Sequence, residues 1–179
     1  RRHELPFERR LLNRSFALHM AAGVGLIVVY TYYYRGGDMT SYWRLGVPIA
    51  DALRYDFSEV FPETASLFLH GEFRLPLEVV GVGSTGTMQA IAVWLLFLLG
   101  DSLYAAALVI TVFSYLAKIM MYRALRGDFT QAHWERVLFA CTLSPTGIVW
   151  TCALLKEPVL MVFFGPAFLG LKFLLDGKR

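Results

Sequence analysis

The polar residues that could do chemistry lie in one stretch of the chain, residues 31–100, between apolar runs. Its first part, residues 35–78, holds seven acids and four arginines. Asp38 is the first of these acids and follows an apolar run that ends in a cluster of tyrosines. If this chain carries out a reaction, we expect it here, and Asp38 is the first residue to test. The same residue could instead cap a helix that begins near Met39.

A glycine-rich turn near the end of this stretch could bind an anion. Its glycines, Gly81, Gly83 and Gly86, have the spacing Gly-x-Gly-x-x-Gly. Hydroxyl side chains lie among and after them, at Ser84, Thr85 and Thr87. The apolar run 90–99 that comes next lacks the strand–helix–strand context of a dinucleotide-binding fold, which argues against that fold. Backbone N–H groups at a helix start bind phosphate in many folds, and the same residues also form turns and helix caps. The sequence leaves both interpretations open.

The composition indicates a multi-pass membrane protein. Of the 179 residues 56% are hydrophobic, which is too apolar for an ordinary water-soluble domain. The two cysteines lie in one apolar run, so a disulfide framework is not expected, and no His/Cys metal spacing occurs. A net charge of +3 is weak evidence for nucleic acid, which we do not expect as a partner.

Hydropathy predicts four membrane spans, at residues 15–34, 102–122, 137–155 and 159–175. Basic residues gather in the flank 1–14, in the loop 123–136 and near the C-terminal end. The positive-inside rule places these segments in the cytoplasm and residues 35–100 outside. We therefore expect an all-α integral membrane protein with both ends of the chain cytoplasmic.

The external loop should contain helices of its own. Apolar residues recur at helical spacing over residues 41–55 and 57–69, which predicts two amphipathic helices on the membrane surface. The run 88–99 would be only about 18 Å long as a helix, too short to cross a bilayer. We interpret it as a re-entrant or interfacial helix. Asp101 is expected to cap the helix that follows.

His19 and Lys118 are ionisable residues inside two of the expected spans. His19 either lies at the headgroup level or has a function within the membrane. Lys118 lies near the end of its span, and its long side chain is expected to reach the interface. In the span 137–155, Ser144-Pro145 removes one backbone hydrogen bond and predicts a kink.

The order of short motifs along the chain is similar to that of a known enzyme class. The motifs are Gly37-Asp38-x-x-x-Tyr42, the run 97–106 with its Leu-Gly-Asp-Ser turn, the basic run 122–126, Ser144-Pro145 followed by Trp150, and Leu154-Leu155-Lys156-Glu157. Together they resemble the N-terminal part of the GT-C class of membrane glycosyltransferases, which includes protein O-mannosyltransferases and aminoarabinose transferases. That class has more spans than four, so this chain would be part of such an enzyme or a shortened relative.

The resemblance implies transfer of a sugar from a polyprenyl-phosphate donor to an acceptor outside the cytoplasm. Asp38 would be the general base, or a ligand of a divalent metal if one is used, and Glu157 would be a second acid facing the same cavity. Substrate contacts would come from Arg35, Tyr42, Gly83, Ser84, Thr85 and Lys156. The alternative for Lys156 and Glu157 is an interfacial pair that marks the water boundary.

Two functions therefore remain open from the sequence. The first is a lipid-linked sugar transferase, whose partners are membrane lipids and the polyprenyl-phosphate sugar. The second is a non-catalytic subunit of a larger membrane complex, in which the same spans serve as packing surfaces for partner subunits.

Overall fold

The computed structural model describes residues 6–81 and 83–177, and all regular secondary structure in them is helical. Three helices are long and apolar enough to cross a membrane, at Pro6–Tyr33, Leu103–Asp128 and Lys156–Leu175. A shorter apolar helix covers Ser84–Leu99. The expected fold class, an all-α membrane protein, is confirmed.

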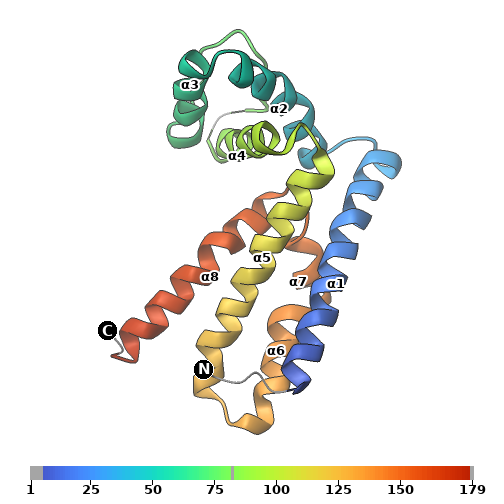
Figure 1. Cartoon of the computed structure of the whole chain (residues 1–179), viewed down its shortest axis with the longest axis vertical. Helices are drawn as coiled ribbons and strands as arrows, with labels where there is room; N and C mark the ends of the chain where they lie inside the picture. The colour runs from blue at the N-terminus through green and yellow to red at the C-terminus, as the bar shows by residue number, and fades with distance from the viewer. Residues whose placement is uncertain (1–5, 82, 178–179) are drawn as a thin grey trace. The chain divides into compact units, whose positions relative to one another are not determined.

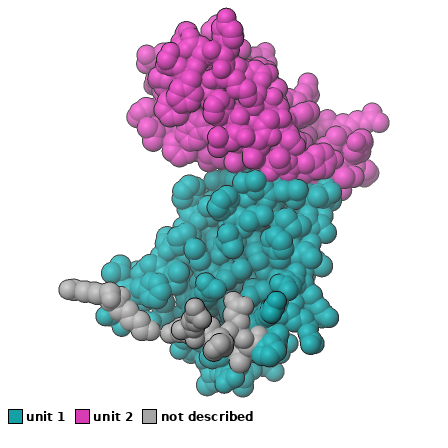
Figure 2. All heavy atoms as spheres, viewed as in Figure 1, with its two compact units in different colours: residues 1–26, 108–179 teal, residues 27–107 magenta. Residues whose placement is uncertain are grey.

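The chain forms two compact units, coloured separately in Figure 2. Unit 1 contains residues 1–26 and 108–179, and unit 2 contains residues 27–107. Helices α1 (Pro6–Val28) and α5 (Leu103–Leu125) each run from one unit into the other.

Unit 1 is built from parts of α1 and α5 together with the helices of the C-terminal half (Figure 1). After α5 come two short 3-10 helices, η2 (Arg126–Asp128) and η3 (Gln131–His133), then α6 (Trp134–Leu143), α7 (Pro145–Trp150) and α8 (Lys156–Leu175). Helix α8 approaches α5 closely, because a Cβ added at Gly165 would lie 2.6 Å from backbone atoms of Ala117. Only glycine fits at that crossing, as is usual where membrane helices pack tightly.

The expected span 137–155 is not one helix, so this prediction is wrong in its detail. Helix α6 ends at Leu143, one residue before the Ser144-Pro145 pair that predicted a kink, and α7 ends at Trp150. Residues 151–155 are buried and non-helical, and Ala153 has a positive φ of 67°. The N–H of Ala153 donates to Thr111 Oγ1 at 2.9 Å, which provides the partner that a buried non-helical backbone needs.

Unit 2 starts with the last turn of α1, which continues as the π-helix η1 (Val29–Tyr33). Helices α2 (Asp38–Tyr55) and α3 (Phe57–Leu69) confirm the two expected amphipathic helices, and α2 begins three residues earlier than predicted. Asp56 separates them and caps α3 by accepting the N–H of Glu59 at 3.1 Å.

Helix α4 (Ser84–Leu99) packs against both α2 and α3 (Figure 1). Its 16 residues give a length of about 24 Å, which is still shorter than a typical membrane span. The core between the three helices is apolar and contains Ile49, Leu53, Val60, Val93 and Leu96. The expected short apolar helix is therefore present, and in the structure it forms the centre of unit 2.

Asp101 does not cap the helix that follows it, so that expectation is wrong. Ser102 takes this place, because its Oγ accepts the N–H of Ala105 at 3.2 Å. The Asp101 carboxylate instead accepts two hydrogen bonds from Arg54, at 2.8 and 2.9 Å. Arg54 also donates to the carbonyl of Leu96 at 2.6 Å, in the last turn of α4, in addition to the N–H groups of Gly100 and Asp101 that this carbonyl accepts.

Candidate functional site

Asp38 lies at the start of α2, directly after the sharp turn that follows η1. The residue before it, Gly37, has a φ of 125°, and a Cβ there would lie 2.7 Å from the ring of Tyr30. The N–H of Gly36 donates to the carbonyl of Tyr30 at 3.2 Å. Glycine is therefore required at position 37 both for its conformation and for space. This turn fixes the position of Asp38 relative to the end of η1.

The structure argues against the interpretation of Asp38 as a helix cap. Gly37 occupies the N-cap position of α2, and Asp38 is the first helical residue. The Asp38 side chain is exposed and has no hydrogen bond or ion pair to any residue that the structure describes. A carboxylate in the first turn is still favoured by the helix dipole. Asp38 is therefore a negatively charged group that is available to a ligand.

The arginines of unit 2 divide into two kinds. Arg54 is held by Asp51 at 2.6 Å and by Asp101, whose hydrogen bonds raise the pKa of the Arg54 guanidinium above its usual range. Arg74 lies 3.4 Å from Glu72. Arg35 and Arg44 are exposed, and neither has a partner among the described residues. Among the described arginines of unit 2, these two are the ones with no protein partner, so an anionic substrate would not have to compete with an acid for them.

Arg35 also has an unusual backbone conformation. Its φ is 54°, in the left-handed region that residues with a Cβ rarely adopt. Such strain persists where the surrounding structure imposes it, and it is common at functional sites. The residue is three positions from Asp38, so the cation and the carboxylate lie on the same short turn.

Tyr42 was expected to contact substrate, but its side chain is fully buried. It lies on the inner face of α2 together with Met39 and Ile49, which are also completely buried. We therefore assign Tyr42 to the core of unit 2 and not to the residues that could contact a substrate.

The glycine-rich turn is largely occupied by contacts to protein. A Cβ at Gly86 would lie 2.9 Å from a methyl carbon of Leu67, and Thr87 Oγ1 donates to the carbonyl of Phe68 at 3.1 Å. Both contacts attach the start of α4 to α3. The expected capping by a side chain is not observed, because the N-cap residue of α4 is Gly83 and no side-chain hydrogen bond within the described residues caps the helix. Gly83 and Ser84 remain exposed, whereas Thr85 is half-buried; Val82 lies outside the described residues.

Lys156 and Glu157 form the first turn of α8 in unit 1. Glu157 is exposed, with no hydrogen bond or ion pair to a described residue, and Lys156 is half-buried. These residues begin a new helix, although the sequence had suggested that they follow the end of a continuous third span. Asp38, Arg35 and the glycine-rich turn belong to unit 2, so the predicted site residues are divided between the two units.

A buried polar network in unit 1 was missed by the sequence reasoning. Lys118 is 3% exposed and its Nζ donates to His19 Nε2 at 2.9 Å and to the carbonyl of Gly147 at 2.7 Å. His19 is fully buried, and its Nδ1 lies 2.7 Å from the carbonyl of Ser15. Because a carbonyl only accepts, Nδ1 carries the proton and Nε2 is the acceptor for Lys118. His19 is therefore neutral in this arrangement.

This network corrects one expectation. The Lys118 side chain does not extend outward along its helix, because it is buried and its Nζ contacts His19 and the carbonyl of Gly147 inside unit 1. Within the described residues no carboxylate lies within ion-pair distance of Lys118. The available sequence signal was the presence of one ionisable residue in each of two apolar runs, since such groups tend to pair inside the bundle.

Metal binding has no support from the residues that the structure describes, since they contain no cluster of three or more His, Cys, Asp or Glu side chains. We therefore derive no reaction step through a metal ion.

The comparisons with known proteins add no relative: no family model matches the chain, and no curated protein or solved structure is significantly similar to it.

Proposed function

We propose that this chain is a lipid-linked sugar transferase of the GT-C kind, or the N-terminal part of one. It would move a sugar from a polyprenyl-phosphate donor to an acceptor hydroxyl on the external side of the membrane. The observation that carries the proposal is the Asp38 carboxylate, which is exposed and has no partner among the described residues at the start of α2.

In this reaction Asp38 is the general base. The carboxylate takes the proton of the acceptor hydroxyl while the hydroxyl oxygen forms a bond to the anomeric carbon of the donor. The bond between that carbon and the phosphate oxygen breaks, its electron pair stays on the oxygen, and polyprenyl phosphate leaves. A base at the membrane surface suits this donor, because its charged phosphate cannot enter the hydrocarbon at low cost.

The donor phosphate needs a cation near Asp38, and Arg35, three positions before it, would supply one. Its side chain is exposed and has no partner within the described residues. A guanidinium binds a phosphate through two parallel hydrogen bonds, which positions as well as neutralises it. In unit 1, Glu157 would act as the second acid and Lys156 would bind phosphate.

The proposed orientation places unit 2 outside the cytoplasm of a bacterial inner membrane. Its support is the charge distribution: the start of α1, the loop after α5 and the end of α8 carry most of the basic residues of unit 1, with Lys118 and Lys156 among the exceptions. Whole-cell labelling of single cysteines tests this orientation. Cysteines at positions 55 and 72 should react from outside, and cysteines at 127 and 131 should not. Labelling at 127 from outside would mean that residues 88–99 cross the membrane and would overturn their interpretation as a re-entrant or interfacial helix.

A second candidate, a non-catalytic subunit, is favoured by α8. Only 17% of its most apolar window is buried, and large exposed side chains run along it, including Leu160, Phe163, Phe164, Leu171 and Leu174. Such a surface suits either lipid or a neighbouring membrane helix.

Donor-dependent transfer separates the two candidates. Membranes that contain the complete gene product should transfer radiolabelled sugar from polyprenyl phosphate to an endogenous acceptor, and membranes lacking it should not. If the protein is expressed and inserted but adds no transfer, the transferase proposal fails and the subunit remains.

A further inference from the structure

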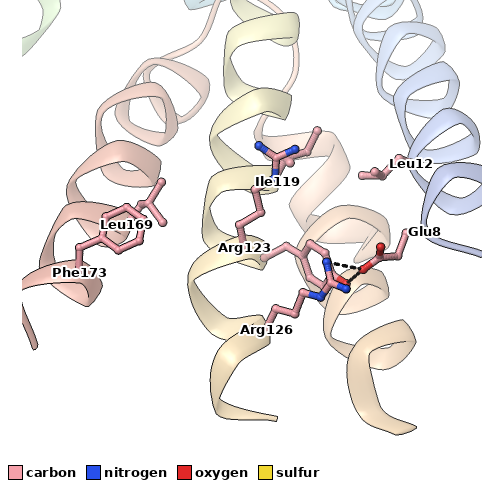
Figure 3. Close-up of a pocket in the computed structure, with 8 residues that line it drawn as sticks. Glu8, Leu12, Ile119, Arg123, Arg126, Leu169 and Phe173 are labelled. Carbon is pink, nitrogen blue, oxygen red and sulfur yellow. Dashed lines mark hydrogen bonds and ion pairs between the residues drawn. The ribbon is translucent and has the colours of Figure 1, made fainter. Parts of the chain in front are cut away.

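A cavity of about 430 Å³ lies in unit 1 between helices α1, α5 and α8 (Figure 3). One part of its wall is apolar and is formed by Leu12, Ile119, Leu169 and Phe173. The other part is polar and is formed by Glu8, Tyr122, Arg123 and Arg126. A ligand that matches this wall has one polar end and one apolar end, and the volume is in the range of small-molecule sites.

The polar wall is partly organised by contacts within the protein. Arg126 lies 3.1 Å from Glu8, and Figure 3 shows the two side chains pointing toward one another. The Tyr122 hydroxyl donates to the same carboxylate, and the Arg126 guanidinium stacks over the ring of Trp134 at 3.9 Å. Glu8 is 1% exposed, so its charge is compensated and is not offered to a ligand.

The charged groups in the cavity favour an anion. Two arginines line it against the single carboxylate of Glu8, which already has two donors. A guanidinium has five N–H donors, so an arginine that makes one contact can still donate to a phosphate. Lys172 does not add to this charge, because it is held by Asp128 at 2.5 Å and by Asp176 at 3.1 Å.

The surroundings identify a lipid as the source of this anion. All three helices that form the cavity are long and apolar enough to cross a membrane, so the apolar wall matches an acyl chain rather than a water-soluble ligand. The neighbouring residues Arg9, Arg10 and Arg14 are exposed at the same end of α1 and would attract anionic headgroups. A free phosphate ion would leave the apolar wall without a partner.

We propose that this cavity binds an anionic phospholipid, with the phosphate at Arg123 and Arg126 and the start of an acyl chain along Leu169 and Phe173. The site is independent of the transferase proposal, because it uses none of the residues assigned to sugar transfer. The phosphate is held at the end of unit 1 where basic residues gather, which is where a lipid phosphate meets the hydrocarbon.

The test is native mass spectrometry of the full protein with added phosphatidylglycerol or phosphatidylcholine. The wild type should retain phosphatidylglycerol in preference to phosphatidylcholine, and Arg123→Gln should weaken phosphatidylglycerol binding about tenfold or more, the factor expected for losing a hydrogen bond between a guanidinium and a phosphate. Arg123→Lys should keep most of the preference. Arg136→Gln is the matched control, since Arg136 is an exposed arginine on the adjoining segment and does not line the cavity.

Four outcomes would overturn the proposal. Equal retention of the two lipids by the wild type would remove the anion preference. An equal loss in Arg123→Gln and Arg136→Gln would assign the preference to general surface charge. Displacement of bound lipid by inorganic phosphate at millimolar concentration, or a mass that shows a second copy of the chain in place of lipid, would assign the cavity to a different occupant.

Discussion

Replacing His19 with leucine should expose the cost of a buried lysine. In the wild type the Lys118 ammonium has two acceptors, His19 Nε2 at 2.9 Å and the Gly147 carbonyl at 2.7 Å. The substitution removes the first acceptor and leaves a buried charge with the carbonyl alone. A hydrogen bond to a charged group contributes about 1.5–3 kcal/mol, so we expect the free energy of unfolding to fall by roughly 2–3 kcal/mol.

A second substitution, Lys118→Met, tests whether the lost stability comes from the buried lysine charge. A lysine inside a membrane helix costs about 2.5–3.5 kcal/mol, and Lys118→Met removes this cost. The double variant His19→Leu/Lys118→Met should therefore be more stable than His19→Leu alone and close to the wild type. The coupling between the two positions should be at least about 2 kcal/mol, beyond what independent sites show.

The assay is unfolding in mixed micelles by titration with SDS, followed by circular dichroism. His70→Leu is the control, because His70 is exposed at the end of α3. If His19→Leu loses no more stability than His70→Leu, or if the two substitutions are additive, then Lys118 and His19 do not form the pair described.

Three further predictions concern packing and charge elsewhere. Gly165→Ala should lower the free energy of unfolding by about 1–3 kcal/mol, because the added Cβ would overlap backbone atoms of Ala117. Gly170→Ala is the control in the same helix: its Cβ would meet nothing within 4 Å, so it should be neutral in the same SDS titration. Arg54→Gln should speed hydrogen exchange in the last turn of α4, since it removes the donor to carbonyls there; unchanged exchange would refute that role. The cap residue Asp56 has a lowered pKa, caused first by the hydrogen bond from the Ser58 hydroxyl and then by the one from the Glu59 amide. Its carboxylate therefore stabilises α3 fully at pH values above the usual aspartate pKa of about 4. This stabilisation is lost as the pH falls through the lowered pKa. Asp56→Asn should keep the cap and remove that acid dependence of exchange in α3, and a variant that still loses protection with the wild-type pH profile would contradict this.

The sequence predicted helices wherever local periodicity was strong. The apolar spacing over residues 41–55 and 57–69 gave α2 and α3 nearly at their observed bounds, because an amphipathic pattern depends only on neighbouring residues. Pro145 correctly marked a break in the expected third span. The loss of helix over residues 151–155 carried no local signal, since it depends on a hydrogen bond from Ala153 to Thr111, which is 42 positions away.

Contacts between distant residues explain the remaining differences. Asp101 follows a glycine and precedes a helix, which is the usual place of a cap, but Arg54 lies 47 positions away and takes its carboxylate. His19 and Lys118 are 99 positions apart, so each appeared as a single ionisable residue in an apolar run. Asp38 is different, because its exposure after the first apolar run could be predicted from the local sequence. Only the structure shows that it does not cap α2, since Gly37 is the N-cap residue.

Sugar transfer by Asp38→Asn is the measurement that tests the proposed function most directly. Asparagine keeps the size of the side chain and caps a helix about as well as aspartate, but it cannot accept the acceptor's proton. In membranes containing the complete gene product, we expect turnover to fall by about 10²- to 10⁴-fold, with donor binding and expression nearly unchanged. Glu59→Gln, at an exposed acid of the same unit, should retain wild-type turnover. Wild-type turnover in Asp38→Asn would contradict the assignment of Asp38 as the base.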